Sequence, residues 1–203
     1  MTNDSSEALV ELCRLFGRRP WCPATGGNFS LRREDAHIQI TRSGSDKSRL
    51  SAADLMLCDL DGRALDAASK PSAETALHTC LYRLDHRIGA VLHTHSVTST
   101  VLSRATPGDL RLRGFEMQTA LAGNHGHEEE IVIAVFDNDQ DIAALATRVE
   151  RRWHAAELTQ PGFLVRGHGL YAWGETLDDA RRHIEGFEFL FACAWQEMLL
   201  RNQ

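Results

Sequence analysis

The sequence has few lysines and no block of basic residues, and both absences narrow the choice of partner. Lysine and arginine together number 22 in the 203-residue chain, yet only Lys47 and Lys70 are lysines. The arginines are scattered, and the formal net charge is −6. A nucleic acid or an anionic membrane is therefore not the expected partner. Scattered arginines still allow a local anion-binding site.

The sequence also has few cysteines and no long apolar run. The five cysteines are widely spaced and form no C-x-x-C pair, which is typical of reduced thiols rather than of a disulfide framework or a zinc site. No apolar run approaches the roughly 18 residues of a membrane span. The first residues also lack the basic and apolar regions of a signal peptide. We therefore expect a cytoplasmic protein.

The length and the hydrophobic content predict one domain that spans residues 1–203. Hydrophobic residues make up 43% of the chain, which is enough to bury one sizeable core. Apolar periodicity predicts helices near residues 4–17, 72–87, 96–104, 137–154 and 176–198. Extended segments are expected at residues 29–32, 37–41, 55–58, 88–92, 110–115, 131–135 and 162–166. No internal repeat divides the chain further.

The segment 88–95 carries the clearest functional signal. Its first five residues are uncharged and mostly apolar, which predicts a strand buried on both faces. His93 and His95 follow, and side chains two residues apart on a strand project from the same face, so both imidazoles could bind one ion. The alternative is a pair of exposed strand histidines, and only a third ligand would decide between the two.

His168 is the candidate for that third ligand. It lies between Gly167 and Gly169, directly after a predicted strand, where little side-chain bulk opposes the close approach of a metal. A single histidine in a turn is more often structural. Three neutral imidazoles would leave a divalent ion with open positions, which is typical of catalytic rather than structural sites.

Several polar turns are candidates for an anion site. Gly26 and Gly27 permit a close backbone approach just before an extended segment. Residues 42–47 combine hydroxyls, a glycine and cations. Ser72 is placed to begin a helix, whose N-terminus attracts phosphate. Each of these segments could also be an ordinary surface turn.

Two glutamates are candidates for acid/base chemistry. Glu74 lies in the first turn of a predicted helix, where an acid also stabilises the helix dipole. Glu116 follows a predicted strand, a place where most acids are simply solvated. A second H-x-H, formed by His125 and His127, lies among glycines and acids, and we interpret it as a loop rather than as a ligand pair.

Five sequence blocks, in order, resemble the class II aldolase/adducin family: TGGNFS at 25–30, TRSG at 41–44, KPSAE at 70–74, HTHS at 93–96 and RGHG at 166–169. The resemblance covers nearly the whole chain. It implies an α/β fold with three layers, α/β/α, and a central, mostly antiparallel sheet. It also implies a homotetramer with sites at subunit interfaces.

The resemblance implies a role for each candidate residue. Three imidazoles are expected to hold one Zn²⁺ per subunit: those of His93, His95 and His168. Four residues are expected near a substrate phosphate: Asn28, Ser43, Gly44 and Ser72. We expect Glu116 to be the principal acid/base, with Glu74 assisting it or serving as an alternative ligand. Imidazole ligands also suit iron and other metals, so the metal stays open.

Within the family, the closest resemblance is to the branch that dehydrates 5-methylthioribulose 1-phosphate to 2,3-diketo-5-methylthiopentyl 1-phosphate in methionine salvage. It rests on FEM at 115–117 and VRGHGLYAWGET at 165–176. One alternative is a class II aldolase or epimerase that acts on a fuculose or ribulose phosphate, because the same enediolate can precede either outcome. A further alternative is a non-catalytic, adducin-like interaction module. Retention of the histidines and of both glutamates favours an enzyme.

Overall fold

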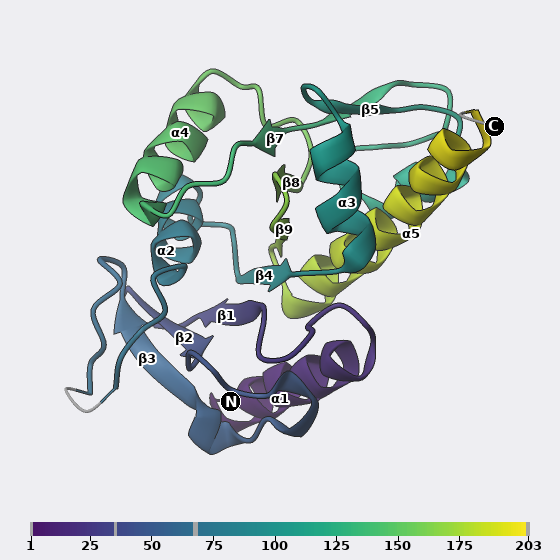
Figure 1. The fold of residues 1–203 in the computed structure, drawn as a ribbon. Helices are drawn as coiled ribbons and strands as arrows, with labels where there is room; N and C mark the ends of the chain where they lie inside the picture. The colour runs from purple at the N-terminus through teal and green to yellow at the C-terminus, as the bar shows by residue number, and fades with distance from the viewer. Residues whose placement is uncertain (1, 35, 67–68, 202–203) are drawn as a thin grey trace.

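The computed structural model describes residues 2–34, 36–66 and 69–201 (Figure 1). Its α-helices are α1 (Thr2–Arg18), α2 (Thr75–Leu84), α3 (Val97–Ala105), α4 (Ile142–His154) and α5 (Leu177–Arg201). Its strands are β1 (Asn28–Arg32), β2 (His37–Thr41), β3 (Leu55–Asp59), β4 (Ala90–Thr94), β5 (Leu110–Leu112), β6 (Ile131–Ile133), β7 (Val135–Phe136), β8 (Gly162–Val165) and β9 (Gly169–Gly174). Its 3-10 helices are η1 (Lys47–Arg49), η2 (Ala52–Asp54) and η3 (Glu116–Ala120).

Seven strands form one sheet in the order β3-β2-β1-β4-β9-β8-β7. All neighbouring pairs are antiparallel except β7 and β8, which are parallel. Strands β5 and β6 form a separate antiparallel pair. The middle of the large sheet is therefore β4, flanked by β1 and β9, and these three strands carry the candidate site.

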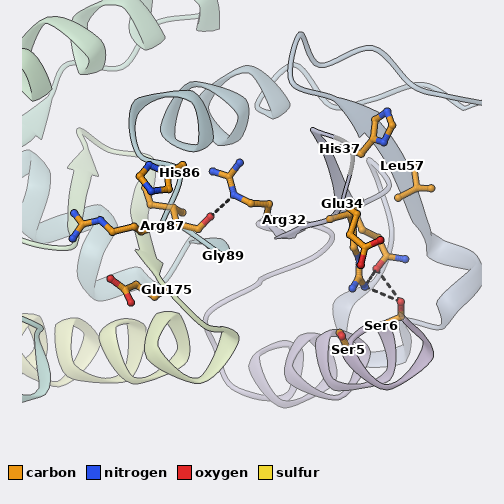
Figure 2. Close-up of a pocket in the computed structure, with 13 residues that line it drawn as sticks. Ser5, Ser6, Arg32, Glu34, His37, Leu57, His86, Arg87, Gly89 and Glu175 are labelled. Atoms are coloured by element: carbon orange, nitrogen blue, oxygen red, sulfur yellow. Dashed lines mark hydrogen bonds between the residues drawn. The ribbon is translucent and has the colours of Figure 1, made fainter. Parts of the chain in front are cut away.

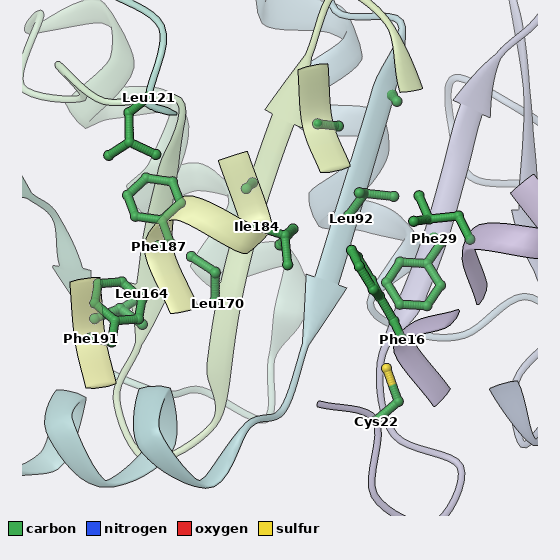
Figure 3. Close-up of a cluster of buried hydrophobic side chains, with 14 of the residues drawn as sticks. Phe16, Cys22, Phe29, Leu92, Leu121, Leu164, Leu170, Ile184, Phe187 and Phe191 are labelled. Carbon is green, nitrogen blue, oxygen red and sulfur yellow. The ribbon is translucent and has the colours of Figure 1, made fainter. Parts of the chain in front are cut away.

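Helices cover both faces of the large sheet. Side chains alternate along each strand, so Leu92 lies in one core with residues of α1, α3 and α5, whereas Val91 lies in a second core with residues of α2 and α4. Figure 3 shows the first core, in which Phe187 of α5 lies beside Leu170 of β9. The expected α/β/α layering around a mostly antiparallel sheet is confirmed.

Polar side chains set the starts of several helices. The hydroxyl of Thr176 accepts a hydrogen bond from the backbone N–H of Asp179 ahead of α5, which begins close to the start predicted near residue 176. Helix α4 begins at Ile142 rather than near residue 137, because the carboxylate of Asp141 caps it by accepting from the Ala144 N–H. Helix α1 begins at Thr2, ahead of the start predicted near residue 4.

The prediction of a single strand over residues 131–135 is wrong. The chain changes partner within this apolar run: β6 pairs with β5, and β7 then joins the large sheet beside β8. The carbonyl of Ala134, between the two strands, accepts a hydrogen bond from the Leu164 N–H. The predicted strand 110–115 likewise ends early, at Leu112.

None of the helices in the described part of the chain combines the length and the apolar character needed to cross a membrane.

Gly89 marks a close contact at the start of β4. A methyl group built on it would lie 2.1 Å from the carbonyl oxygen of Glu175. We expect Gly89→Ala to lower the free energy of unfolding by about 1–3 kcal/mol, the usual cost of overpacking a rigid site. Chemical denaturation measures the change. Gly108→Ala is the control, because nothing lies within 4 Å of the added methyl group there; equal stability of the two variants would contradict this account.

Candidate active site

The candidate site lies in the middle of the large sheet, along the edge formed by the ends of its central strands, where β4 ends and β1 and β9 begin. Asn28 and His93 are paired across β1 and β4, and His93 is paired with Tyr171 across β4 and β9. Gly169 lets the chain pass here, since a methyl group on it would lie 2.0 Å from the carbonyl oxygen of Thr94. The turn before Gly169 brings His168 to the same edge.

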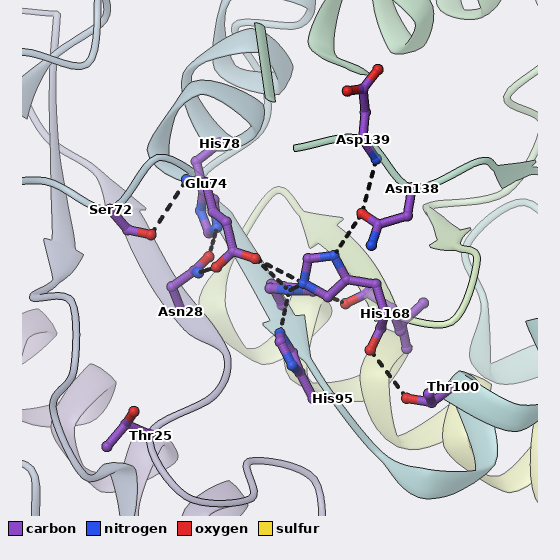
Figure 4. Close-up of polar contacts among 12 residues, drawn as sticks. Thr25, Asn28, Ser72, Glu74, His78, His95, Thr100, Asn138, Asp139 and His168 are labelled. Carbon is purple, nitrogen blue, oxygen red and sulfur yellow. Dashed lines mark hydrogen bonds and ion pairs between the residues drawn. The ribbon is translucent and has the colours of Figure 1, made fainter. Parts of the chain in front are cut away.

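Four electron-rich atoms converge at this edge (Figure 4). The Nε2 atom of His93 lies 2.7 Å from that of His95 and 3.3 Å from that of His168. The Oε1 atom of Glu74 lies 2.8 Å from Nε2 of His168 and 3.4 Å from Nε2 of His93. All four ligand atoms lie within 4.8 Å of one another.

The second ring nitrogens fix the tautomers of two of the histidines. Nδ1 of His93 lies 2.9 Å from the carbonyl oxygen of Leu170, which only accepts, so this nitrogen carries the proton. Nδ1 of His168 lies 3.3 Å from Oδ1 of Asn138, an oxygen that also accepts from the Asp139 N–H. Both Nε2 atoms therefore present lone pairs toward the cluster, as metal-ligating imidazoles do.

The charge state of the cluster also suits a cation. Burial lowers the pKa of His93, and burial lowers the pKa of His95 to about 3, so both rings are neutral at pH 7. Burial alone would raise the pKa of Glu74, but its close contacts with the imidazoles of His168 and His93 outweigh burial and lower the pKa below its usual range. Neutral imidazoles beside a carboxylate are a donor set that fits a divalent metal.

The surroundings hold the central imidazole rigidly. The His93 ring is fully buried and stacks on the Tyr171 ring at 3.8 Å, and Tyr171 stacks in turn on Phe163 at 5.2 Å. On the opposite face of β4, the Thr94 hydroxyl donates to the buried carboxyl of Glu188. Burial raises the pKa of Glu188 to about 7. The end of β4 is thus anchored in both cores.

The structure brings two of the predicted phosphate-binding residues together. A cavity of about 590 Å³ is lined by Ser43 and Ser72 with Arg42, Lys70, Pro71 and Ala73. Gly44 lies in the same turn as Ser43 and has a φ of +76°, which an L-residue rarely adopts. The cavity combines two hydroxyls with two cations, which is suitable for an anion.

Lys47, one of the cations of the predicted turn at 42–47, supports both candidate anion-binding turns. Its side chain is buried, and its ammonium donates to the carbonyl oxygens of Thr25 at 2.9 Å and Ser45 at 2.8 Å. It therefore joins the turn before β1 to the turn after β2.

Asn28 does not line the cavity described above. Its amide nitrogen donates to Oε2 of Glu74, and its oxygen faces Nε2 of His78. The amide of Asn28 is therefore engaged with the glutamate of the histidine cluster rather than with the serines. His78 was not among the predicted site residues, although it lies in α2 one turn after Glu74, the residue that precedes this helix.

Glu116 lies apart from the cluster within one chain. It begins η3, its side chain is 80% exposed, and its Oε2 lies 3.1 Å from Nδ1 of His127. No hydrogen bond or ion pair among the described residues joins it to His93, His95 or His168. The second H-x-H lies in an irregular loop, as expected, and its His127 contacts Glu116.

A further cavity, of about 730 Å³, lies at the other end of β1 and β4 (Figure 2). Two arginines at its wall are already engaged by the protein. Arg32 donates to the carbonyl oxygens of Tyr82 and Ile88, and Arg87 pairs with Asp85 at 2.7 Å. None of the predicted site residues lines this cavity.

The sequence matches the family model described as the class II aldolase and adducin N-terminal domain over residues 7–195. The chain is 52% identical over 199 residues to the methylthioribulose-1-phosphate dehydratase of Serratia proteamaculans, a match that covers 98% of this chain and 97% of the relative. It is 54% identical over 199 residues to the enzyme of the same name from Pectobacterium atrosepticum, with the same coverage.

Solved structures agree with these sequence matches. The L-fuculose-1-phosphate aldolase of Thermus thermophilus superposes with a TM-score of 0.72 at 25% identity, covering 97% of this chain and 95% of that one. YgbL of Escherichia coli superposes with a TM-score of 0.79 at 24% identity, covering 94% and 87%. The match to the family model, the relatives at about half identity and the shared fold agree. The chain belongs to the class II aldolase and adducin family.

Proposed function

We propose that this protein is a hydro-lyase that converts 5-methylthioribulose 1-phosphate to 2,3-diketo-5-methylthiopentyl 1-phosphate in methionine salvage. The observation that carries the proposal is the identity of more than half, over nearly the full length, with relatives that bear this dehydratase name. The histidine and glutamate cluster supplies the matching chemistry. The reaction removes the proton at carbon 3 and the hydroxyl at carbon 4, and the resulting enol becomes the diketone.

Three imidazoles, those of His93, His95 and His168, would hold one divalent ion, which we propose is Zn²⁺. Their converging lone pairs and the carboxylate of Glu74 support this assignment. When bound, such an ion acts as a Lewis acid that polarises a carbonyl oxygen. Glu74 would assist by accepting hydrogen bonds at the edge of the site or by serving as an alternative ligand.

The polar cavity beside the cluster is the proposed phosphate site. Ser43 and Ser72 would donate hydroxyl hydrogen bonds, and Arg42 and Lys70 would supply charge. Gly44 allows the turn that presents Ser43. The amide of Asn28 is held by Glu74 and His78, so we propose that Asn28 contributes to phosphate binding only through its backbone at the start of β1.

Glu116 would act as the principal acid/base from a neighbouring protomer. Its exposed side chain and its absence from the group of converging ligand atoms support an arrangement in which a second copy of the chain completes each site. A homotetramer, as the family resemblance implies, would provide such neighbours. The carboxyl group would take the proton from carbon 3 or give one to the hydroxyl that leaves carbon 4.

The chain would act as one domain in the cytoplasm. The single large sheet draws strands from residue 28 to residue 174, which supports one domain over residues 1–203. The five cysteines are all free thiols, as in a reducing compartment.

Product analysis tests the proposed activity. We expect the purified protein to convert 5-methylthioribulose 1-phosphate to a product that is lighter by one water, detected by mass spectrometry. Fuculose 1-phosphate, the matched aldol substrate, should remain intact. Cleavage of fuculose 1-phosphate without dehydration would overturn the proposal in favour of an aldolase, and inertness toward both would favour a non-catalytic module.

Metal analysis tests the proposed ligands. We expect about one zinc per chain in the wild type. Loss of an outer-shell partner typically weakens metal binding by about 10–100-fold, and His95→Ala, which removes a ligand, should weaken it further. Elemental analysis after dialysis against a weak chelator gives the ratio. His154→Ala, which changes an exposed histidine on α4, should retain the metal. Full zinc occupancy in His95→Ala would show that this residue is not a ligand.

Glu116→Gln tests the acid/base assignment. Turnover should fall by about 10²–10⁴-fold, because an amide can no longer exchange the proton, while the zinc content stays unchanged. Glu128→Gln, an exposed acid in the same region, is the control and should turn over normally. Mixing inactive Glu116→Gln and His95→Ala protomers should restore part of the activity. Failure of the mixture, with subunit exchange verified, would contradict action across the interface.

A further inference from the structure

A chain of hydrogen bonds leads from Glu74 into the interior of the protein (Figure 4). Oε2 of Glu74 accepts from the amide nitrogen of Asn28, and the amide oxygen of Asn28 faces Nε2 of His78. Nδ1 of His78 lies 2.7 Å from the hydroxyl of Ser30, which lies 2.8 Å from the hydroxyl of Tyr82. Beyond Glu74, every member is a buried residue.

Only one set of proton positions satisfies this chain. The carboxylate of Glu74 accepts only, so the NH₂ group of Asn28 must face it, and the amide oxygen must face His78. Nε2 of His78 therefore donates. Burial keeps this imidazole neutral by lowering its pKa to about 3, so Nδ1 accepts, and the Ser30 hydroxyl is its donor. The alternative acceptor for that hydroxyl, the carbonyl of Val91, is farther away at 3.5 Å.

The two oxygens of Glu74 thus have different partners. Oε1 faces the imidazoles of His93 and His168, whereas Oε2 is held by Asn28. If the amide of Asn28 turned over, its oxygen would face the carboxylate and repel it. The Nε2 donor of His78 opposes that rotation, because a reversed amide would present NH₂ to an N–H group.

We propose that His78 is a positioning residue, which fixes the amide of Asn28 and thereby aims Glu74 at the imidazole cluster. The role rests on the proposed function, in which Glu74 serves that cluster. An amide does not pass protons readily, so the chain transmits orientation rather than protons.

The side chain of His78 is packed on all sides. The side chain has no exposed surface, and the ring meets that of Tyr171 edge-to-face at 5.9 Å. Glu74 directly precedes α2 with helical backbone angles, and His78 follows one turn later, so both side chains reach the same strand, β1, at Asn28 and Ser30 respectively. The contacts of the His78 ring with Asn28 and Ser30 explain why a histidine occupies this buried position in α2.

Kinetics of two replacements test the proposal. His78→Leu should lower kcat by about 10–100-fold, the range for a lost outer-shell partner, with little change in KM, because His78 does not line the phosphate cavity. His78→Gln should recover most of kcat, because its side-chain amide can donate to Asn28 and accept from Ser30. Thr79→Val is the matched control: Thr79 is buried on the same helix and donates only within it, to Ala76.

A double-mutant cycle separates positioning from a general structural role. If His78 acts through Glu74, adding His78→Leu to Glu74→Gln should lower turnover by no more than about twofold beyond the single variant, whereas independent effects would multiply. Normal turnover in His78→Leu would overturn the proposal. So would a folded His78→Gln variant that is as impaired as His78→Leu. So would multiplicative losses in the cycle.

A readout that needs no activity separates this inference from the proposed function. In uniformly ¹⁵N-labelled protein, NMR should report His78 as the tautomer that carries its proton on Nε2, and the side-chain NH₂ signals of Asn28 should shift in His78→Leu. A proton on Nδ1 would refute the positioning role even in an active dehydratase. The expected tautomer in a protein without dehydratase activity would instead refute only the function.

Discussion

Mutual repulsion among four electron-rich atoms is the constraint on which the rest of the site depends. Three imidazole nitrogens and one carboxylate oxygen lie within 4.8 Å of one another, and two of those nitrogens present lone pairs by their tautomers. Such a group is stable only if a cation neutralises it or if the protein holds it rigidly. The surrounding structure provides the rigidity, through the backbone acceptor at Leu170, the acceptor at Asn138 and the aromatic stack below His93.

The antiparallel arrangement of the central strands explains why residues distant in sequence meet here. In an antiparallel sheet the end of one strand lies beside the beginning of its neighbours, so the residues after β4 meet those before β9 and at the start of β1. The helix α2 then brings Glu74 over this edge. The polar turns that form the anion cavity flank the same edge, so that charge, hydroxyls and imidazoles face one region.

Much of this arrangement could be predicted from the sequence, and the exceptions have physical reasons. The strand before His93 and the turn at His168 are visible because an apolar run stops abruptly at polar residues. The family resemblance supplied the layering and the grouping of the histidines, whose role as ligands stays a prediction. The break at Ala134 was missed because the whole run is apolar and only the pairing partners differ. The burial of Lys47 and the position of His78 beside the site were missed because both depend on what surrounds the side chain. The isolation of Glu116 from the cluster depends on tertiary packing, which no local pattern encodes.

The aromatic stack has a consequence for how the protein could change its substrate. His93 lies flat on Tyr171, which lies on Phe163 within the second core, so the reactive centre is continuous with the hydrophobic interior. Moving that imidazole would require the interior to repack. The turns at residues 42–46 and 70–73 are not stacked on this interior. Substitutions there could therefore change which substrate is recognised while the imidazoles stay in place. Recognition and reactivity are thereby free to evolve at different rates.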